Sequence, residues 1–358
     1  MQRRRSFLAF VLAALVAGPT AAQPAPVRIY VPNQMGASIS VLDGAGTLLA
    51  TVDLRPLGFS AHAMPHQVAA MPDGSAWFVT LAGDGFLLKF DRENRLVART
   101  PFAVPGMVVV DPGRDRVYAS RALGAVSVPS SLGVFRASDL ALLDEPGVFI
   151  PRPHALAVDT VSGRVYAGSL SANQLASWDP ASERADVTEV DGPAHVFVGL
   201  ATSPDGRRLA ATTQLTNLLI AFDASPPGPL RRVGDVPVEG WPYDAAWSPD
   251  GRTVWFPNQR AGSVTRVDAT SWTVTAVIRD PAFQEPHGVV LTPDSRTVYV
   301  SSHGRVLGEH AGHAAAGHDM DSPRANGSLA VIDAATGAVR RVTEVGPYAA
   351  ALGLSGGN

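Results

Sequence analysis

The sequence predicts an all-β fold, a seven-bladed β-propeller, and three observations support that prediction. A turn of the Pro-Asp-Gly type recurs in steps of 40 to 48 residues, the usual length of a propeller blade. Beyond residue 22, no stretch shows helical periodicity of useful length, whereas short β-rich segments flank the turns. The two ends of the chain carry incomplete repeat units that complement each other.

The first 22 residues have the parts of an export signal. Arg3, Arg4 and Arg5 precede an apolar run at 7–17, and small residues follow at 20–22. The run is too short to span a bilayer comfortably, so we expect a cleaved signal peptide and a periplasmic or secreted protein over 23–358, without a membrane anchor. Residues 4–8 also fit the core of a twin-arginine signal, and an ordinary secretory signal is the alternative.

The recurrent turn indicates where the strands begin and end. Proline presets φ, aspartate bonds to the backbone that follows it, and glycine takes the left-handed position. Each turn should therefore join two antiparallel strands. The turns are Pro72-Asp73-Gly74, Pro112-Gly113, a weaker copy at 159–163, Pro204-Asp205-Gly206, Pro249-Asp250-Gly251 and Pro293-Asp294-Ser295.

Each predicted blade has four strands, which we call A to D from the central channel outward. Strand A is the apolar segment before the turn, as at 289–291, and strand B is the β-rich segment after it, as at 297–300. Strand C ends in aspartate, and strand D is more polar, as at 273–278. The expected C strands are 87–91, 175–179, 219–223, 264–268 and 329–333.

The chain ends predict how the ring closes. Residues 29–31 and 39–43 supply strands B and C, a D strand follows near 49–54, and strand A is missing. At the other end, residues 347–352 resemble a strand A with nothing after it. Pairing of the two pieces would complete the seventh blade and remove the free sheet edges, so we expect a closed monomer.

Composition excludes several kinds of chemistry. The chain has no cysteine, so disulfides, thiolate metal sites, iron–sulfur clusters and cysteine nucleophiles are all excluded. Removal of residues 1–22, which carry three arginines and no acidic residue, takes the formal net charge from −3 to −6. This charge opposes binding to nucleic acid. Any bound metal would need histidine, methionine, carboxylate or carbonyl ligands.

Several segments resemble the YVTN repeats of bacterial periplasmic propellers. These are residues 29–33, residues 298–302, and the units in which Pro-His precedes Pro-Asp-Gly by a fixed spacing, as at Pro65-His66. The resemblance extends over the whole chain after the signal peptide, and it implies the propeller fold. It does not imply one activity, because such propellers include binding proteins, lyases, lactonases and redox domains.

All nine histidines map to one face of the predicted disc, the face that carries the D–A and B–C loops. Three of them share one blade position at the start of strand A, on the rim of the channel: His66, His154 and His287. The other blades place Gly106, Val198, Tyr243 and Tyr348 at that position. His62 and His195 lie in D–A loops, and the last blade has a B–C insertion at 303–326 with His303, His310, His313 and His318.

Convergence of a histidine rim and a histidine-rich insertion predicts a metal site. Neutral imidazole is the commonest protein metal ligand, and short histidine-rich tracts with carboxylates are typical of metal binding. Histidine with carboxylates suits Zn, and histidine with the methionines of this face suits Cu. We therefore expect a periplasmic carrier or sequestering protein for Zn or Cu. Its fixed site would consist of His66, His154 and His287 with His195 or His62 in support, and the insertion would capture metal through His303, His310, His313 and His318. A periplasmic protein partner is a further hypothesis. A mobile histidine-rich segment above a fixed site is similar in architecture to propeller metallochaperones of the AztD type.

Two other functions stay open at this stage. Glu285 and His287 lie two residues apart at the same mouth, and a lyase- or lactonase-type enzyme could use them as acid and base with a divalent ion. A metal-independent scaffold for protein partners is the second alternative. Each rim histidine taken singly is better explained as a hydrogen-bonded packing residue, and the insertion could be a solvated loop; the convergence of the two features on one face is what favours a metal site.

Overall fold

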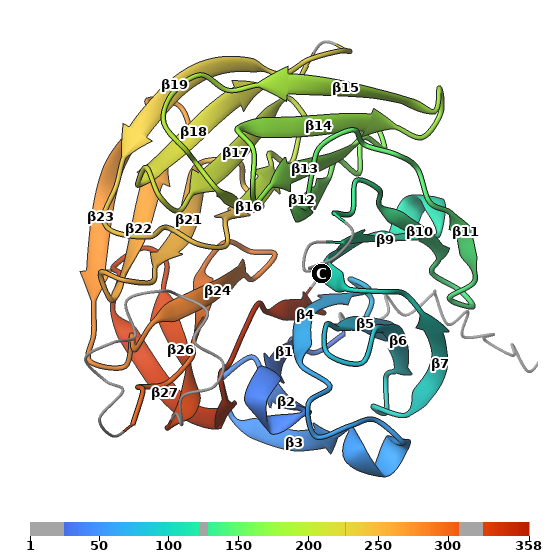
Figure 1. The fold of residues 1–358 in the computed structure, drawn as a ribbon. Helices are drawn as coiled ribbons and strands as arrows, with labels where there is room; N and C mark the ends of the chain where they lie inside the picture. Colours follow the sequence, from blue (N-terminus) through green and yellow to red (C-terminus); the bar gives the residue numbers. More distant parts are fainter. Residues whose placement is uncertain (1–24, 122–127, 226, 308–324, 358) are drawn as a thin grey trace, which may run out of the picture.

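The computed structural model describes residues 25–121, 128–225, 227–307 and 325–357, and these form seven four-stranded antiparallel sheets arranged around a central channel (Figure 1). The predicted seven-bladed propeller is confirmed. Within the described residues, no helix has both the length and the apolar character needed to cross a membrane.

The strands follow one order in each blade, from the channel outward. We number the blades from the N-terminus. Blade 1 contains β28 (Gly353–Ser355), β1 (Arg28–Asn33), β2 (Ser38–Asp43) and β3 (Leu48–Asp53). Blade 2 contains β4 (Pro65–Ala70), β5 (Ala76–Leu81), β6 (Phe86–Asp91) and β7 (Leu96–Pro101). Blade 3 contains β8 (Pro105–Asp111), β9 (Arg116–Arg121), β10 (Gly133–Arg136) and β11 (Leu142–Asp144).

The remaining four blades repeat this order. Blade 4 contains β12 (Pro153–Val158), β13 (Val165–Ser169), β14 (Gln174–Asp179) and β15 (Arg184–Glu189). Blade 5 contains β16 (Phe197–Thr202), β17 (Arg208–Thr213), β18 (Leu218–Asp223) and β19 (Arg231–Pro237). Blade 6 contains β20 (Ala246–Trp247), β21 (Thr253–Asn258), β22 (Ser263–Asp268) and β23 (Thr273–Arg279). Blade 7 contains β24 (Pro286–Leu291), β25 (Thr297–Ser302), β26 (Asn326–Asp333) and β27 (Val339–Pro347).

The aspartates of the repeat act as turn-forming groups. In the A–B turns, the Asp205 carboxylate accepts a hydrogen bond from the Arg207 backbone N–H at 3.1 Å, and Gly206 takes φ +71°. In the C–D turns, the Asp268 carboxylate accepts from the backbone N–H groups of Thr270 and Ser271. Hydrogen bonds from the Ser203 hydroxyl and the Arg207 N–H lower the pKa of Asp205, and those from Ser271 and Thr270 lower the pKa of Asp268, because they stabilise the ionised form. The repeat pattern predicted these turns correctly, because each aspartate bonds to groups within a few residues of itself in the chain.

The C-terminal strand closes the ring, as predicted. In β28, Gly353 and Leu354 pair antiparallel with Tyr30 and Ile29 of β1. The paired strand lies a few residues later than the expected segment at 347–352. That segment instead carries single bridges, Asn33 with Ala349 and Gln67 with Ala351, which tie it to blades 1 and 2. The chain therefore ends beside the channel (Figure 1).

The core lies between neighbouring blades rather than inside any one sheet. Between blades 1 and 2, for example, Tyr30 stacks on Trp77 with ring centroids 5.1 Å apart, and Trp77 stacks on Phe90 at 4.1 Å. All three rings are almost fully buried. This packing fixes the positions of the A strands, and with them the side chains at the rim of the channel.

Candidate functional site

The same backbone conformation precedes strand A in all seven blades. A non-glycine residue with left-handed φ, between 48° and 59°, stands directly before the strand in five blades and five residues before its first residue in blades 1 and 6. In six blades its carbonyl accepts a hydrogen bond from the first residue after strand B. Left-handed backbone is unfavourable for side-chain-bearing residues, and such residues concentrate at functional sites. The residues are Met64, Val104, Arg152, Val196, Trp241, Glu285 and Tyr348.

The residue two positions later is the true rim residue. By this alignment the rim consists of Ala350, His66, Gly106, His154, Val198, Tyr243 and His287, in blades 1 to 7. Tyr348 was expected at the rim of blade 1 but has the backbone conformation of Glu285, so Ala350 takes that place. The sequence alignment was misplaced there because blade 1 lacks the proline that precedes the rim residue in most other blades.

His66 and His154 meet at the channel although they belong to blades 2 and 4. Their Nε2 atoms lie 3.3 Å apart, and both side chains are buried. Blade 3 lies between them, and its rim residue is Gly106, which has no side chain to separate the two rings. The other ring nitrogen of His66, Nδ1, lies 2.5 Å from the side-chain amide of Gln34.

His287 and His303 form a second cluster with two tyrosines. The two imidazole centroids are 4.7 Å apart, His287 contacts the ring of Tyr243, and His303 stacks on Tyr348 at 3.8 Å. His303 was assigned to the insertion, but it is buried and stands at the first position after strand B. Gln34 of blade 1 and Gln259 of blade 6 occupy the same position.

Two polar side chains face Nδ1 of His303. The Gln259 amide lies 3.3 Å away, and the Glu285 carboxylate Oε2 lies 3.6 Å away. Glu285 is partly exposed, with 29% of its side chain accessible, whereas His303 is 1% exposed. The expected acid–base partners of Glu285 thus include His303 as well as His287, and Glu285 itself holds the strained position before the rim.

His195 has a different environment from the rim histidines. Its Nε2 lies 3.1 Å from the Asp191 carbonyl, which can only accept, so Nε2 carries the proton and Nδ1 accepts from the Thr216 hydroxyl at 2.8 Å. Both ring nitrogens are therefore engaged by the protein. His62 is exposed in the loop before β4. His310, His313 and His318 lie outside the described residues.

No group of three or more histidine, aspartate or glutamate side chains stands close enough to hold a metal ion within the described part of the chain. The channel mouth instead carries two separate pairs of histidines, His66 with His154 and His287 with His303. A metal bound at either pair would keep open positions for water or for a ligand that the described residues do not provide.

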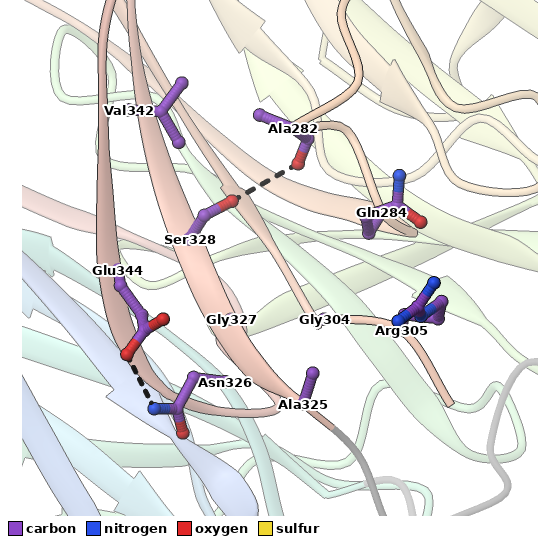
Figure 2. A pocket seen from close by; sticks show the side chains of 10 residues that line it. All are labelled: Ala282, Gln284, Gly304, Arg305, Ala325, Asn326, Gly327, Ser328, Val342 and Glu344. Carbon is purple, nitrogen blue, oxygen red and sulfur yellow. Dashed lines mark hydrogen bonds between the residues drawn. The ribbon is translucent and has the colours of Figure 1, made fainter. Parts of the chain in front are cut away.

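A pocket of about 330 Å³ lies at the base of the insertion (Figure 2). Its walls come from both ends of the insertion, including Arg305 and Asn326, and from the loop before β24, including Gln284. The Asn326 amide donates to Glu344 at 2.9 Å, so the polar groups on this side of the pocket are mutually bonded.

A second cavity, of about 290 Å³, lies in the central channel and contains a residue that sequence reasoning missed. Asp244 lines it, one position after the rim residue Tyr243. The equivalent residues of the other blades are Gln67, Met107, Ala155, Gly199, Gly288 and Ala351. Alignment of the repeats at this position would have revealed Asp244 as the one charged member of the set.

Comparisons with known proteins agree on the fold. A family model described as "Lactonase, 7-bladed beta-propeller" matches residues 157–292. A search of curated proteins gave no match. Among solved structures, a functionally unknown protein from Desulfotomaculum acetoxidans DSM 771 has 15% identity and a TM-score of 0.67, covering 89% of this chain and 99% of that chain.

Two further solved structures have named activities. A streptogramin B lyase has 13% identity and a TM-score of 0.63, covering 77% of this chain and 89% of that chain. The dihydro-heme d1 dehydrogenase NirN, solved in complex with DHE, has 13% identity and a TM-score of 0.59, covering 91% and 74%. At these identities the likeness concerns the seven-bladed architecture alone.

Proposed function

We propose that this protein binds Zn or Cu between His66 and His154 and acts as a periplasmic carrier or sequestering protein for that metal. One observation carries the proposal, the 3.3 Å separation of the two Nε2 atoms. Nitrogen ligands about 2.0–2.1 Å from a tetrahedral Zn ion lie roughly 3.3–3.4 Å apart. The rings thus already have the spacing of two ligands of one ion.

The surroundings of the pair fit a metal ligand set. Metal-bound imidazoles usually engage their second nitrogen in a hydrogen bond, which fixes the ring and the tautomer. Gln34 contacts Nδ1 of His66, and its oxygen would accept the Nδ1 proton after rotation of the amide. The described residues supply two ligands to such an ion, fewer than the four protein ligands of a closed structural site, which suits a site that exchanges its metal.

The test is a competition titration of the signal-free protein with Zn and with Cu. Wild type should bind one of them with submicromolar affinity, and the His66→Ala/His154→Ala variant should lose about 100-fold or more. His62→Ala removes an exposed histidine of the same blade and should bind as wild type does. Equal affinity of the double variant and wild type would mean that the pair is a hydrogen bond between two packed imidazoles.

A further variant tests the contribution of the insertion. Replacement of His310, His313 and His318 by alanine leaves the rim intact. If the insertion helps to capture the metal, the rate of metal uptake should fall while the His66–His154 site still binds. An unchanged uptake rate would remove the insertion from the proposed function.

A second candidate is an acid–base enzyme centred on Glu285 and His303. The 3.6 Å approach of a carboxylate to a buried imidazole at the channel mouth is the specific observation that favours it. The family model for lactonases and the structural likeness to a streptogramin lyase suggest lactones and streptogramin B as the substrates to screen. Turnover by wild type that falls at least 100-fold in Glu285→Gln and persists in His66→Ala would establish this function instead of metal carriage.

A further inference from the structure

The cavity in the central channel has an apolar wall built by the A strands of several blades. Its lining includes Met107, Leu156, Leu200, Val289 and Leu352, and its volume is about 290 Å³. Cavities near this size are at the small end of those that hold organic ligands. The wall therefore suits a small molecule with an apolar body.

Asp244 is the exception in that wall. Its side chain is 7% exposed, and no hydrogen bond or ion pair to its carboxyl group was found among the described residues. The two polar side chains beside it in the lining bond elsewhere, since the Thr202 hydroxyl donates to the Val158 carbonyl and the Gln67 oxygen accepts from the Val108 N–H. A buried carboxyl without a partner destabilises a protein, and a ligand that pairs with it offsets that cost.

We propose that the channel is a binding site for a small organic cation, a primary amine with an apolar body, whose ammonium group pairs with Asp244. The apolar body would lie against the hydrophobic wall, where its burial contributes about 25 cal/mol per Å². A divalent metal fits this cavity poorly, because hard cations need several oxygen ligands and the wall offers one carboxylate. The site does not depend on the histidine pair or on the proposed metal function.

Binding at this site should depend on pH. Burial raises the pKa of Asp244 to about 8, so at neutral pH the free protein holds a proton there that an ammonium ligand must displace. None of the other lining residues, from β4, β8, β12, β16, β24 or 352, is charged. In its own segment, before β20, the neighbour is Tyr243, whose pKa burial raises well above 10, so it stays neutral. Affinity should rise up to about tenfold per pH unit and level off above about pH 8.

The probe is 2-phenylethylamine, and its neutral control is 2-phenylethanol, which has nearly the same shape. Calorimetry of the metal-free protein should show binding of the amine, at least tenfold weaker binding of the alcohol, and a loss of at least tenfold for the amine in Asp244→Asn. Ala246→Leu, which fills the cavity without touching the charge, should also weaken binding. Asp144→Asn removes an exposed carboxylate and should change nothing.

The proposal fails if the amine and the alcohol bind wild type equally, if Asp244→Asn binds the amine as wild type does, or if no amine binds at millimolar concentration. Failure here is separable from failure of the metal proposal. The His66→Ala/His154→Ala variant should keep the amine site, and Asp244→Asn should keep the metal site.

Discussion

At the residue scale, Asp244 couples the stability of the fold to pH. Its pKa is about 8 in the folded protein against 3.8 as the ordinary value, so the folded state keeps a proton that the unfolded state loses over this range. Because the unfolded state binds fewer protons, the free energy of unfolding falls as pH rises from about 4 to about 8. The slope from this one group is up to about 1.4 kcal/mol per pH unit.

We expect Asp244→Asn to remove that slope. The variant should be more stable than wild type at about pH 8 by several kcal/mol, and the difference should shrink toward pH 5. Urea denaturation of both proteins at several pH values measures this difference in unfolding free energy. The turn aspartates have lowered pKa values and affect stability in the opposite sense, but their contribution is the same in both proteins and cancels in the comparison. A difference independent of pH would show that Asp244 is ionised in the folded state.

Gln34 provides a second prediction at this scale. It contacts Nδ1 of His66, and the equivalent residue of blade 6, Gln259, contacts His303 instead. If His66 is a metal ligand, Gln34→Leu should lower metal affinity about 10- to 100-fold while Gln259→Leu leaves it unchanged. Equal effects of the two substitutions would point to a general disturbance of the rim, and no effect of either would remove Gln34 from the site.

At the element scale, the segment leading into strand A carries strain in every blade. A β-branched residue such as Val196 at φ +59° is an outlier, and left-handed backbone costs roughly 1–2 kcal/mol in residues with a side chain. The strain is held by the hydrogen bond from the Gln214 N–H to the Val196 carbonyl. The same arrangement, repeated around the ring, directs the rim side chains of different blades toward one axis.

Replacement of the strained valine by glycine should therefore stabilise the protein. Val196→Gly relieves the strain but adds freedom to the unfolded chain, so the expected net gain is about 0.5–1 kcal/mol. Val97→Gly, in the exposed part of β7, has no strain to relieve and should destabilise by about as much. Thermal or urea unfolding measures both, and destabilisation in both variants would contradict the strain argument.

Sequence periodicity was sufficient to predict the strands, but it was insufficient to predict which side chains meet at the candidate site. Turn aspartates and the C-strand aspartates act within a few residues, so a pattern in the chain reveals them. The contact of His66 with His154 depends on an absent side chain at Gly106 in the blade between them, which no local pattern records. His303 was read as part of the insertion for a related reason, because its ring stacks on Tyr348, which lies beyond the insertion and two strands later.

At the scale of the whole molecule, the ring depends on a very short closing strand. Strand β28 has three residues, Gly353 to Ser355, yet it is the channel wall of blade 1 and covers the edge that β1 would otherwise expose. Leu352, just before it, packs with Ile29 and Val31 in the core between blades 7 and 1. Residues 352–355 therefore contribute at once to sheet pairing, to core packing and to the channel lining.

Removal of residues 353–358 should open the ring. The truncated protein would lose three backbone pairings and expose an unpaired edge of β1, a ready template for association with other chains. We expect a fall in the unfolding free energy of several kcal/mol and concentration-dependent aggregation, because small losses are a large share of total stability. Removal of Asn358 alone is the control, since it leaves β28 whole. Scattering and thermal unfolding check both outcomes, and a truncated chain that stays monomeric with an unchanged Tm would mean that the bridges at Ala349 and Ala351 suffice to close the propeller.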